Sequence, residues 1–199
     1  MTRFRTALAA TLVCFSATAA ADLSSVPSGN YGLDKTHGYI TFSYDHLGFS
    51  NPHVGFESFE VELSLDNENI ENSTVNVMID ATSISSRVEV FDGHLNGANF
   101  FDTANHPTIT FKSTGIQMTG DTTMNVTGDL TIKGVTKPVT LETTINKAAN
   151  HPMRQVPTIG VSSTTKVSRS DWGLDRAVPS VSDEVTIWME VELLRNIDQ

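Results

Sequence analysis

The sequence is poor in the residues and motifs that commonly carry catalysis, metal binding or covalent cross-linking. One cysteine, Cys14, is present among 199 residues, and it lies close to the N-terminus. The chain has no Gly-x-Ser-x-Gly elbow, no Gly-rich phosphate loop after a strand and no His-Glu-x-x-His pair. Its six histidines form no His-x-x-x-His pair, so no tight ligand set for zinc is apparent. We therefore expect neither an enzyme nor a metal protein.

Positive charge is also scarce. The chain has 13 Lys and Arg against 23 Asp and Glu, which gives a net charge of −10. A surface of this sign disfavours nucleic acid or an anionic membrane as a bulk partner. The carboxylates are spread along expected strands, as is typical of a solvated outer face. Asp171 and Asp175 are spaced for acid–base chemistry, but they lie in an expected surface turn anchored by Trp172, so we assign them no catalytic role.

Long apolar runs are missing, and the N-terminal one is short. Two arginines precede an apolar segment at residues 7–15, and alanines at 19–21 stand before Asp22. This order predicts a secretory signal peptide over residues 1–21 rather than a membrane span. Val13 is too large for the position before a lipidated cysteine at Cys14, so we expect a soluble exported protein. In a Gram-negative bacterium its location would be the periplasm.

Residues 22–199 are expected to form one domain. Cleavage removes the cysteine and two arginines, leaving 11 Lys and Arg against 23 Asp and Glu, a net charge of −12. An exported domain without disulfides depends on its own hydrophobic core, and a chain of this length can supply one. We find no biased linker and no internal repeat that would divide it.

Alternation of apolar and polar residues dominates this region and predicts about eight strands. Turn signals separate them at regular spacing, which favours an antiparallel sandwich or a closed barrel. In the hairpin at 125–141, Gly128 interrupts the apolar face, so this face could line a cavity as easily as fill a core. The expected strands lie near residues 40–44, 59–65, 75–79, 109–111, 125–132, 139–145, 159–167 and 185–193.

One segment, residues 85–101, departs from the β pattern. Its apolar residues Val88, Phe91 and Leu95 have roughly helical spacing, and Ser85 or Ser86 could cap the start. Glycines within the segment weaken the helix, so we expect one or two short helices. A helix between barrel strands commonly lies across one end, and we expect its apolar face to close the interior like a lid.

Several motifs, taken in order, resemble the YceI-like family of exported polyisoprenoid-binding proteins, which have a lipocalin-like barrel. The similarity runs from about Tyr31 to Leu193. The chain departs from the family pattern at Phe91, where an arginine is usual, and at Gly38, where serine is frequent. A role of that arginine in holding a polar head would be lost here or transferred to Arg87. The matching segments are residues 34–38 with 46–50, 91–102 with 106–113, 127–139 and 169–174.

The resemblance implies an all-β, antiparallel lipocalin-like barrel of about eight strands, with one or two short helices at its mouth. It also implies a non-enzymatic protein that holds a polyprenyl lipid or an isoprenoid quinone, without a covalent cofactor. Two alternatives stay open. One is a binder of another amphiphile, such as a fatty acid or fatty amide, in stress protection. The other is a structural β-domain whose interior is filled with side chains.

Strand parity selects the candidate wall of such a tunnel. These residues are Phe42, Tyr44, Phe59, Val61, Leu63, Val77, Ile79, Ile109, Phe111, Leu130, Ile132, Leu141, Ile187 and Met189. Large apolar residues outside the strands are candidates for the mouth or lid: Phe49, Phe56, Leu95, Phe100 and Phe101. His46 and His94 are candidate contacts for a polar head group. A homodimer through an exposed strand edge is compatible with the pattern, but no residue specifies it.

Overall fold

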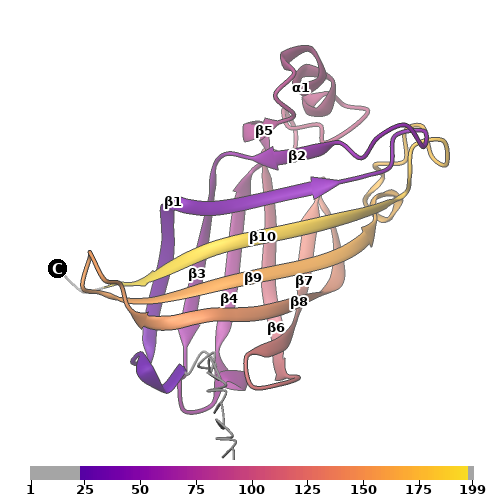
Figure 1. Cartoon of the computed structure of the whole chain (residues 1–199). Coiled ribbons are helices and arrows are strands. Elements are labelled where there is room, and N and C mark those ends of the chain that lie inside the picture. The colour runs from indigo at the N-terminus through magenta and orange to yellow at the C-terminus, as the bar shows by residue number, and fades with distance from the viewer. Residues whose placement is uncertain (1–22, 197–199) are drawn as a thin grey trace, which may run out of the picture.

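The computed structural model describes residues 23–196, in which eight long strands close into an antiparallel barrel (Figure 1). Their order is β10-β9-β8-β7-β6-β4-β3-β1, and β10 pairs with β1 to close the ring. The expected fold class is therefore confirmed. The strands are β1 (Gly29–Ser43), β2 (His53–Phe56), β3 (Phe59–Leu65), β4 (Thr74–Asp80), β5 (Ile84–Ser85), β6 (Thr108–Met118), β7 (Thr123–Ile132), β8 (Val135–Asn150), β9 (Pro157–Ser168) and β10 (Glu184–Arg195).

Strand β1 turns a corner and serves two neighbours. Its first residues pair with β3, whereas Ile40–Ser43 pairs with the short strand β2, which in turn pairs with β5. A bulge at residues 34–37 separates the two halves and shifts the register with β10. Gly38 follows the bulge. A side chain at this position would be too close to its neighbours, because a Cβ there would lie 2.8 Å from a methyl group of Leu33. The alternation of the sequence fails across this bulge, which is why only the second half of β1 was predicted.

One α-helix, α1 (Glu89–Asn96), lies at the end of the barrel near β2 and β5 (Figure 1). The helix is shorter than the segment that suggested it, and its N-cap is Val88 rather than Ser85 or Ser86. Ser86 instead donates from its backbone N–H and its hydroxyl to Asp92 Oδ1, at 2.6 and 2.5 Å. The remaining helical turns are 3-10: η1 (Leu23–Ser25), η2 (Ile70–Asn72), η3 (Ala81–Ser83) and η4 (Arg169–Trp172). No helix within residues 23–196 has the length and apolar character needed to cross a membrane.

An aromatic ring on β6 packs against a glycine on β7. The ring of Phe111 on β6 packs over Gly128 on β7, and a Cβ at Gly128 would lie 2.4 Å from that ring. The glycine thus admits an aromatic ring where a side chain would otherwise stand. Away from α1, the interior is closely filled, and Tyr31, Val26 and Ile159 are almost completely buried.

Strands β8 and β9 are hydrogen-bonded along only part of their length, and we call the gap between them the β8–β9 seam. Their ladder runs from Asn150–Pro157 to Glu142–Thr164 and ends there. Beyond it, the first residues of β8 pair only with β7 and the last residues of β9 only with β10. An outer cleft of about 790 Å³ lies at this divergence, and Pro138, which has no N–H to donate, stands on its β8 side.

Candidate functional site: an apolar cavity at the mouth of the barrel

A cavity of about 630 Å³ occupies the α1 end of the barrel. Its walls come from seven strands, from α1 and from the loops before β2 and after β9, and they are mostly aliphatic and aromatic. Three rings predicted from the sequence meet there: Phe42 lies 6.0 Å from Phe56 and 6.1 Å from Phe101, and Phe56 and Phe101 meet edge to face at 5.8 Å. The site is therefore concave and apolar, as expected for a small-molecule pocket.

Two much smaller cavities continue from this one toward the filled end of the barrel. The first, of about 70 Å³, shares Ile79, Leu130 and Ile187 with the main cavity. The second, of about 60 Å³, shares Leu141 and Met189 with the first. Because each space shares wall residues with the next, the three follow one another through the interior.

The structure places most of the predicted wall residues on these spaces, although whether they contact a ligand stays a prediction. The main cavity is lined by Phe42, Tyr44, His46, Phe56, Ile79, Leu95, Phe100, Phe101, Ile109, Leu130, Ile132 and Ile187. The middle cavity adds Val77, Phe111, Leu141 and Met189, and the last one adds Val61 and Leu63.

Three predicted site residues lie elsewhere. Phe49 projects into solvent from the loop between β1 and β2, with 88% of its surface exposed. His94 is exposed on α1, whereas its neighbour Leu95 is buried. Phe59 is buried, but it packs at the β1 corner near Gly38 and borders none of the three cavities. The sequence placed Phe49 and His94 near the mouth and Phe59 on the wall, but it could not give the direction of their side chains.

Sequence reasoning missed the part of the wall built from loops and from short or irregular segments. The additional lining residues from these segments are Pro52, His53, Val54, Ser86, Arg169, Trp172, Leu174, Arg176, Ala177 and Val181. Alternation carries no information in a loop, so no periodic signal marks them. Ile40, Val167 and Val185 also line the cavity from predicted strands, and Val88 and Phe91 line it from the segment expected to form the lid. The motif at residues 169–174 was one available signal, because three of its members, Arg169, Trp172 and Leu174, line the cavity.

Arg169 holds the loop that follows β9 against the cavity. Its guanidinium donates to the backbone carbonyls of Ser182, at 2.9 Å, Val181, at 3.2 Å, and Leu174. Burial lowers the pKa of this group, while the carboxylates of Asp183 and Asp175 oppose the shift. Because backbone carbonyls accept the hydrogen bonds of its guanidinium, Arg169 holds the loop in place.

Trp172 stands between the cavity and the outer cleft at the β8–β9 seam. Its side chain is buried and lines both spaces, and its indole N–H donates to the carbonyl of Leu130 at 3.3 Å. The indole therefore fills the place where the strand ladder is interrupted. The wall of the cavity at this point is a side chain rather than a hydrogen-bonded sheet.

The few polar groups of the cavity lie toward its opening. Tyr44, His46, His53, Ser86 and Arg176 contribute them in addition to Arg169, and among residues 23–196 no Asp or Glu lines the cavity. Burial raises the pKa of the Tyr44 phenol, with the charge of Arg169 opposing, so this hydroxyl stays a hydrogen-bond donor. In an acidic chain, the opening is thus lined by donors and cationic groups.

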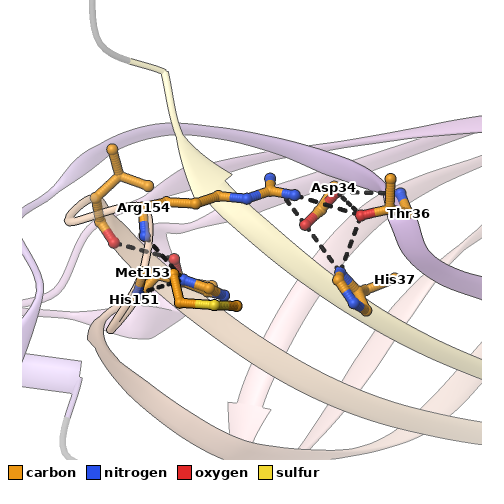
Figure 2. A network of polar contacts seen from close by, with 8 residues as sticks. Asp34, Thr36, His37, His151, Met153 and Arg154 are labelled. Carbon is orange, nitrogen blue, oxygen red and sulfur yellow. Dashed lines mark hydrogen bonds and ion pairs between the residues drawn. The ribbon is translucent and has the colours of Figure 1, made fainter.

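A separate polar cluster surrounds Asp34, which is buried in the β1 bulge (Figure 2). Its carboxylate accepts hydrogen bonds from Thr36 and His37 and pairs with Arg154 at 2.9 Å. Burial alone would raise the pKa of Asp34, but these hydrogen bonds and the Arg154 charge outweigh it and lower the pKa. The cluster ties the β8–β9 turn to β1, far from α1.

This cluster also has one arrangement of atoms that resembles a metal site. Asp34, His37 and Glu192 each offer a ligand atom, and these atoms lie within 4.8 Å of one another. A cation would have to compete with Arg154 for the same carboxylate. The donor set therefore fits an ion pair between Asp34 and Arg154 better than a metal centre.

Comparison with known proteins connects this architecture to a family. The YceI-like domain matches residues 31–193. The chain belongs to the YceI-like family. Protein YceI of Escherichia coli O157:H7 is 34% identical to it over 170 residues, covering 84% of this chain and 88% of the relative.

Solved structures show that the YceI-like barrel recurs among relatives. The YCEI protein of Campylobacter jejuni is 26% identical, has a TM-score of 0.70 and covers 77% of this chain and 90% of its own. A domain from Saccharophagus degradans, described as polyisoprenoid binding and implicated in plant cell wall breakdown, has a TM-score of 0.65 at 14% identity. Its alignment covers 85% of this chain and all of that domain, and at this identity the likeness concerns the fold alone.

Proposed function

We propose that this YceI-like protein sequesters or carries a long isoprenoid lipid, either a polyprenyl lipid or an isoprenoid quinone, and performs no chemistry on it. The observation that carries the proposal is the apolar cavity of about 630 Å³, which falls within the usual range of small-molecule sites. The polyisoprenoid-binding description of the Saccharophagus degradans domain supports the ligand class.

The tail of such a lipid would lie along the barrel axis. Each methylene moved from water into an apolar wall contributes roughly 0.8 kcal/mol, so ten enclosed carbons contribute about 8 kcal/mol before the cost of ordering the tail. A tail longer than the main cavity would displace the side chains that separate the smaller spaces. Met189 lies between both small cavities and suits this role, because an unbranched thioether repacks easily.

The head group would stay at the opening, among the donors of Tyr44, His46 and Arg176. These groups suit an oxygen acceptor, such as a quinone carbonyl or a phosphate oxygen. Titration of lipid release through the imidazole range, in wild type and in His46→Ala, tests the histidine's part. A pH effect that disappears in the variant supports it, and no pH effect in either protein argues against it.

We also propose that the protein acts in the periplasm after removal of residues 1–21, which lie outside the described residues. The basic, apolar and small-residue order of that segment supports this. Cell fractionation followed by N-terminal sequencing tests it. A mature chain that begins at Asp22 in the periplasmic fraction is the expected result, and an uncleaved cytoplasmic protein would contradict it.

Native mass spectrometry and solvent extraction of the purified protein test the ligand. A bound isoprenoid mass supports the proposal, whereas a fatty acid or fatty amide mass supports the alternative amphiphile. Protein that contains no lipid and takes none up from an isoprenoid quinone solution would contradict both.

A matched pair of variants on β4 tests the location. Ile79 lines the main cavity, and Met78, the preceding residue, is exposed on the outer face. Ile79→Trp should fill the passage toward the middle cavity and reduce the bound lipid several-fold, while Met78→Trp should leave it unchanged. Equal lipid content in two folded variants would place the ligand elsewhere.

A further inference from the structure

Exposed apolar side chains gather around the opening of the cavity. Leu47 and Phe49 project from the loop between β1 and β2, and Val88 and Val90 from the start of α1; we call these four the rim patch. Phe49 is 88% exposed and Val90 74%. They make up half of the large exposed hydrophobic residues between positions 23 and 196. Such residues are normally scattered, so their grouping at one end points to a binding surface.

The position of the rim patch follows from its neighbours. His46 and Pro52, which flank Leu47 and Phe49 in the chain, line the cavity, and so does Val88 itself. Figure 1 shows the β1–β2 loop and α1 at the same end of the barrel. The patch therefore borders the opening on two sides.

Hydrogen bonds define the turn that carries Leu47 and Phe49. Gly48 N–H donates to Asp45 Oδ1 at 2.8 Å, and Phe49 N–H donates to the carbonyl of His46 at 3.0 Å. Leu47 itself has a φ of 60°, a left-handed conformation that is unfavourable for a branched aliphatic residue. Leu47 is also 49% exposed, so packing within the molecule does not account for a branched aliphatic side chain at this position.

Cationic groups accompany the patch. Arg87 directly precedes Val88, and Arg176 lines the opening. Within residues 23–196, neither guanidinium takes part in an ion pair. The same segments also carry Asp45, Glu89, Asp92 and Asp175, so the rim has charges of both signs. The guanidinium groups of Arg87 and Arg176 can bind lipid phosphates there.

We propose that the mouth of the barrel docks on a phospholipid bilayer. Phe49 and Leu47 enter the apolar region, Val88 and Val90 form a second contact, and Arg87 and Arg176 bind lipid phosphates. The cavity then opens onto the acyl layer, and a lipid passes between membrane and barrel without crossing water. This inference rests on the proposed function for its purpose, but vesicle binding tests it separately from ligand content.

The experiment uses the processed protein and vesicles of phosphatidylethanolamine and phosphatidylglycerol, with flotation as the measurement. The double variant Leu47→Asn/Phe49→Ser should bind at least about tenfold less than wild type, and asparagine keeps the left-handed backbone acceptable. Val88→Ser/Val90→Ser should lose severalfold. Met153→Ser is the matched control, because Met153 is 84% exposed on the β8–β9 turn, away from the rim patch, and should bind as wild type does.

Several results would overturn the inference. They are no binding by the wild-type protein, equal binding by the folded double variant, or an equal loss in Met153→Ser. Sedimentation without vesicles gives a further one: a wild-type dimer that the double variant abolishes would assign the patch to a second copy. A wild-type protein that contains lipid but does not bind the vesicles refutes this inference alone. Docking by a protein that never contains lipid refutes the proposed function alone.

Discussion

The two ends of the barrel use the same strands for different purposes. At the α1 end the interior holds a cavity of about 630 Å³, whereas toward the other end the remaining spaces are only about 70 and 60 Å³. The filled end contains the almost completely buried Tyr31, Val26 and Ile159. The ion pair between Arg154 and Asp34 also ties the β8–β9 turn to β1 there. The difference indicates that the filled end stabilises the fold and so allows the other end to stay hollow.

A hollow interior has a thermodynamic cost, because side chains that face a void lose contacts they would have in a packed core. In this barrel the cost is confined to one end. Substitutions at the two ends should consequently have opposite profiles, with large effects on unfolding at the filled end and large effects on ligand content at the hollow end.

The largest effect on stability is expected from Ile159→Ala. Ile159 is 1% exposed in the filled end, and its truncation should lower the free energy of unfolding by about 4 kcal/mol through lost burial and a new cavity. Urea unfolding of lipid-free protein measures this value. Ile159 also borders the cavity of about 60 Å³, and its truncation only enlarges that space, so native mass spectrometry should find no less lipid in the variant. Reduced lipid in a folded Ile159→Ala protein would contradict the division of roles.

The next largest loss of stability is expected from removal of the Asp34 carboxylate. Asp34→Ala should cost roughly 3 kcal/mol at neutral pH, because it removes several hydrogen bonds to a buried charge and the ion pair with Arg154. The folded-state pKa of Asp34 lies below its ordinary value of 3.8, so the stabilisation is present above about pH 4 and is lost as the pH falls below it.

Unfolding curves measured from neutral pH to below pH 4 check the sign of this pH dependence of stability. The difference between wild type and Asp34→Ala should be largest near neutrality and should shrink in acid. Asp129→Ala, on the exposed face of β7, serves as the control and should change stability little at any pH. A difference that grows on acidification would disprove the assignment.

A smaller effect is expected where the Phe111 ring packs over Gly128. Gly128→Ala should destabilise by about 2 kcal/mol, since the new methyl would collide with the Phe111 ring and the carbonyl of Lys112. Gly115→Ala on β6 is the comparison, because a Cβ there meets no atom within 4 Å. Thermal unfolding of both proteins measures the contrast, and similar melting temperatures would mean that the ring moves aside freely.

The smallest change in stability should follow from Ile187→Ala at the hollow end. Ile187 already faces the main and middle cavities, so truncation loses fewer contacts and should cost about 1 kcal/mol in lipid-free protein. Comparison with Ile159→Ala by the same urea titration sharpens the contrast between the ends. Equal costs for the two substitutions would show that the hollow end is packed in solution.

The sequence predicted the regular part of the barrel because alternation reports directly on a half-buried strand. The hairpin of β7 and β8 turns at Lys133 and Gly134, as its glycine signal indicated, and the weak pattern near 159–167 became β9. The family motifs supplied the closure of the sheet, which alternation alone left open between a sandwich and a barrel.

The remainder depended on contacts distant in the sequence. The bulge in β1 is stabilised by Arg154, more than a hundred residues away, and β2 is too short for any periodicity. The direction of Phe49 follows from a hydrogen-bonded turn, and Trp172 is buried because a strand ladder ends beside it. Local patterns contain none of this information.

The indole of Trp172 gives the protein an intrinsic optical reporter. It lines the cavity in a buried setting, while Trp188 on β10 stacks against His53 at 5.4 Å. A guest entering the barrel changes the surroundings of the first tryptophan more than those of the second, and a quinone guest would quench its emission. Fluorescence of Trp172→Phe and Trp188→Phe variants can therefore follow filling and emptying in real time, without a label.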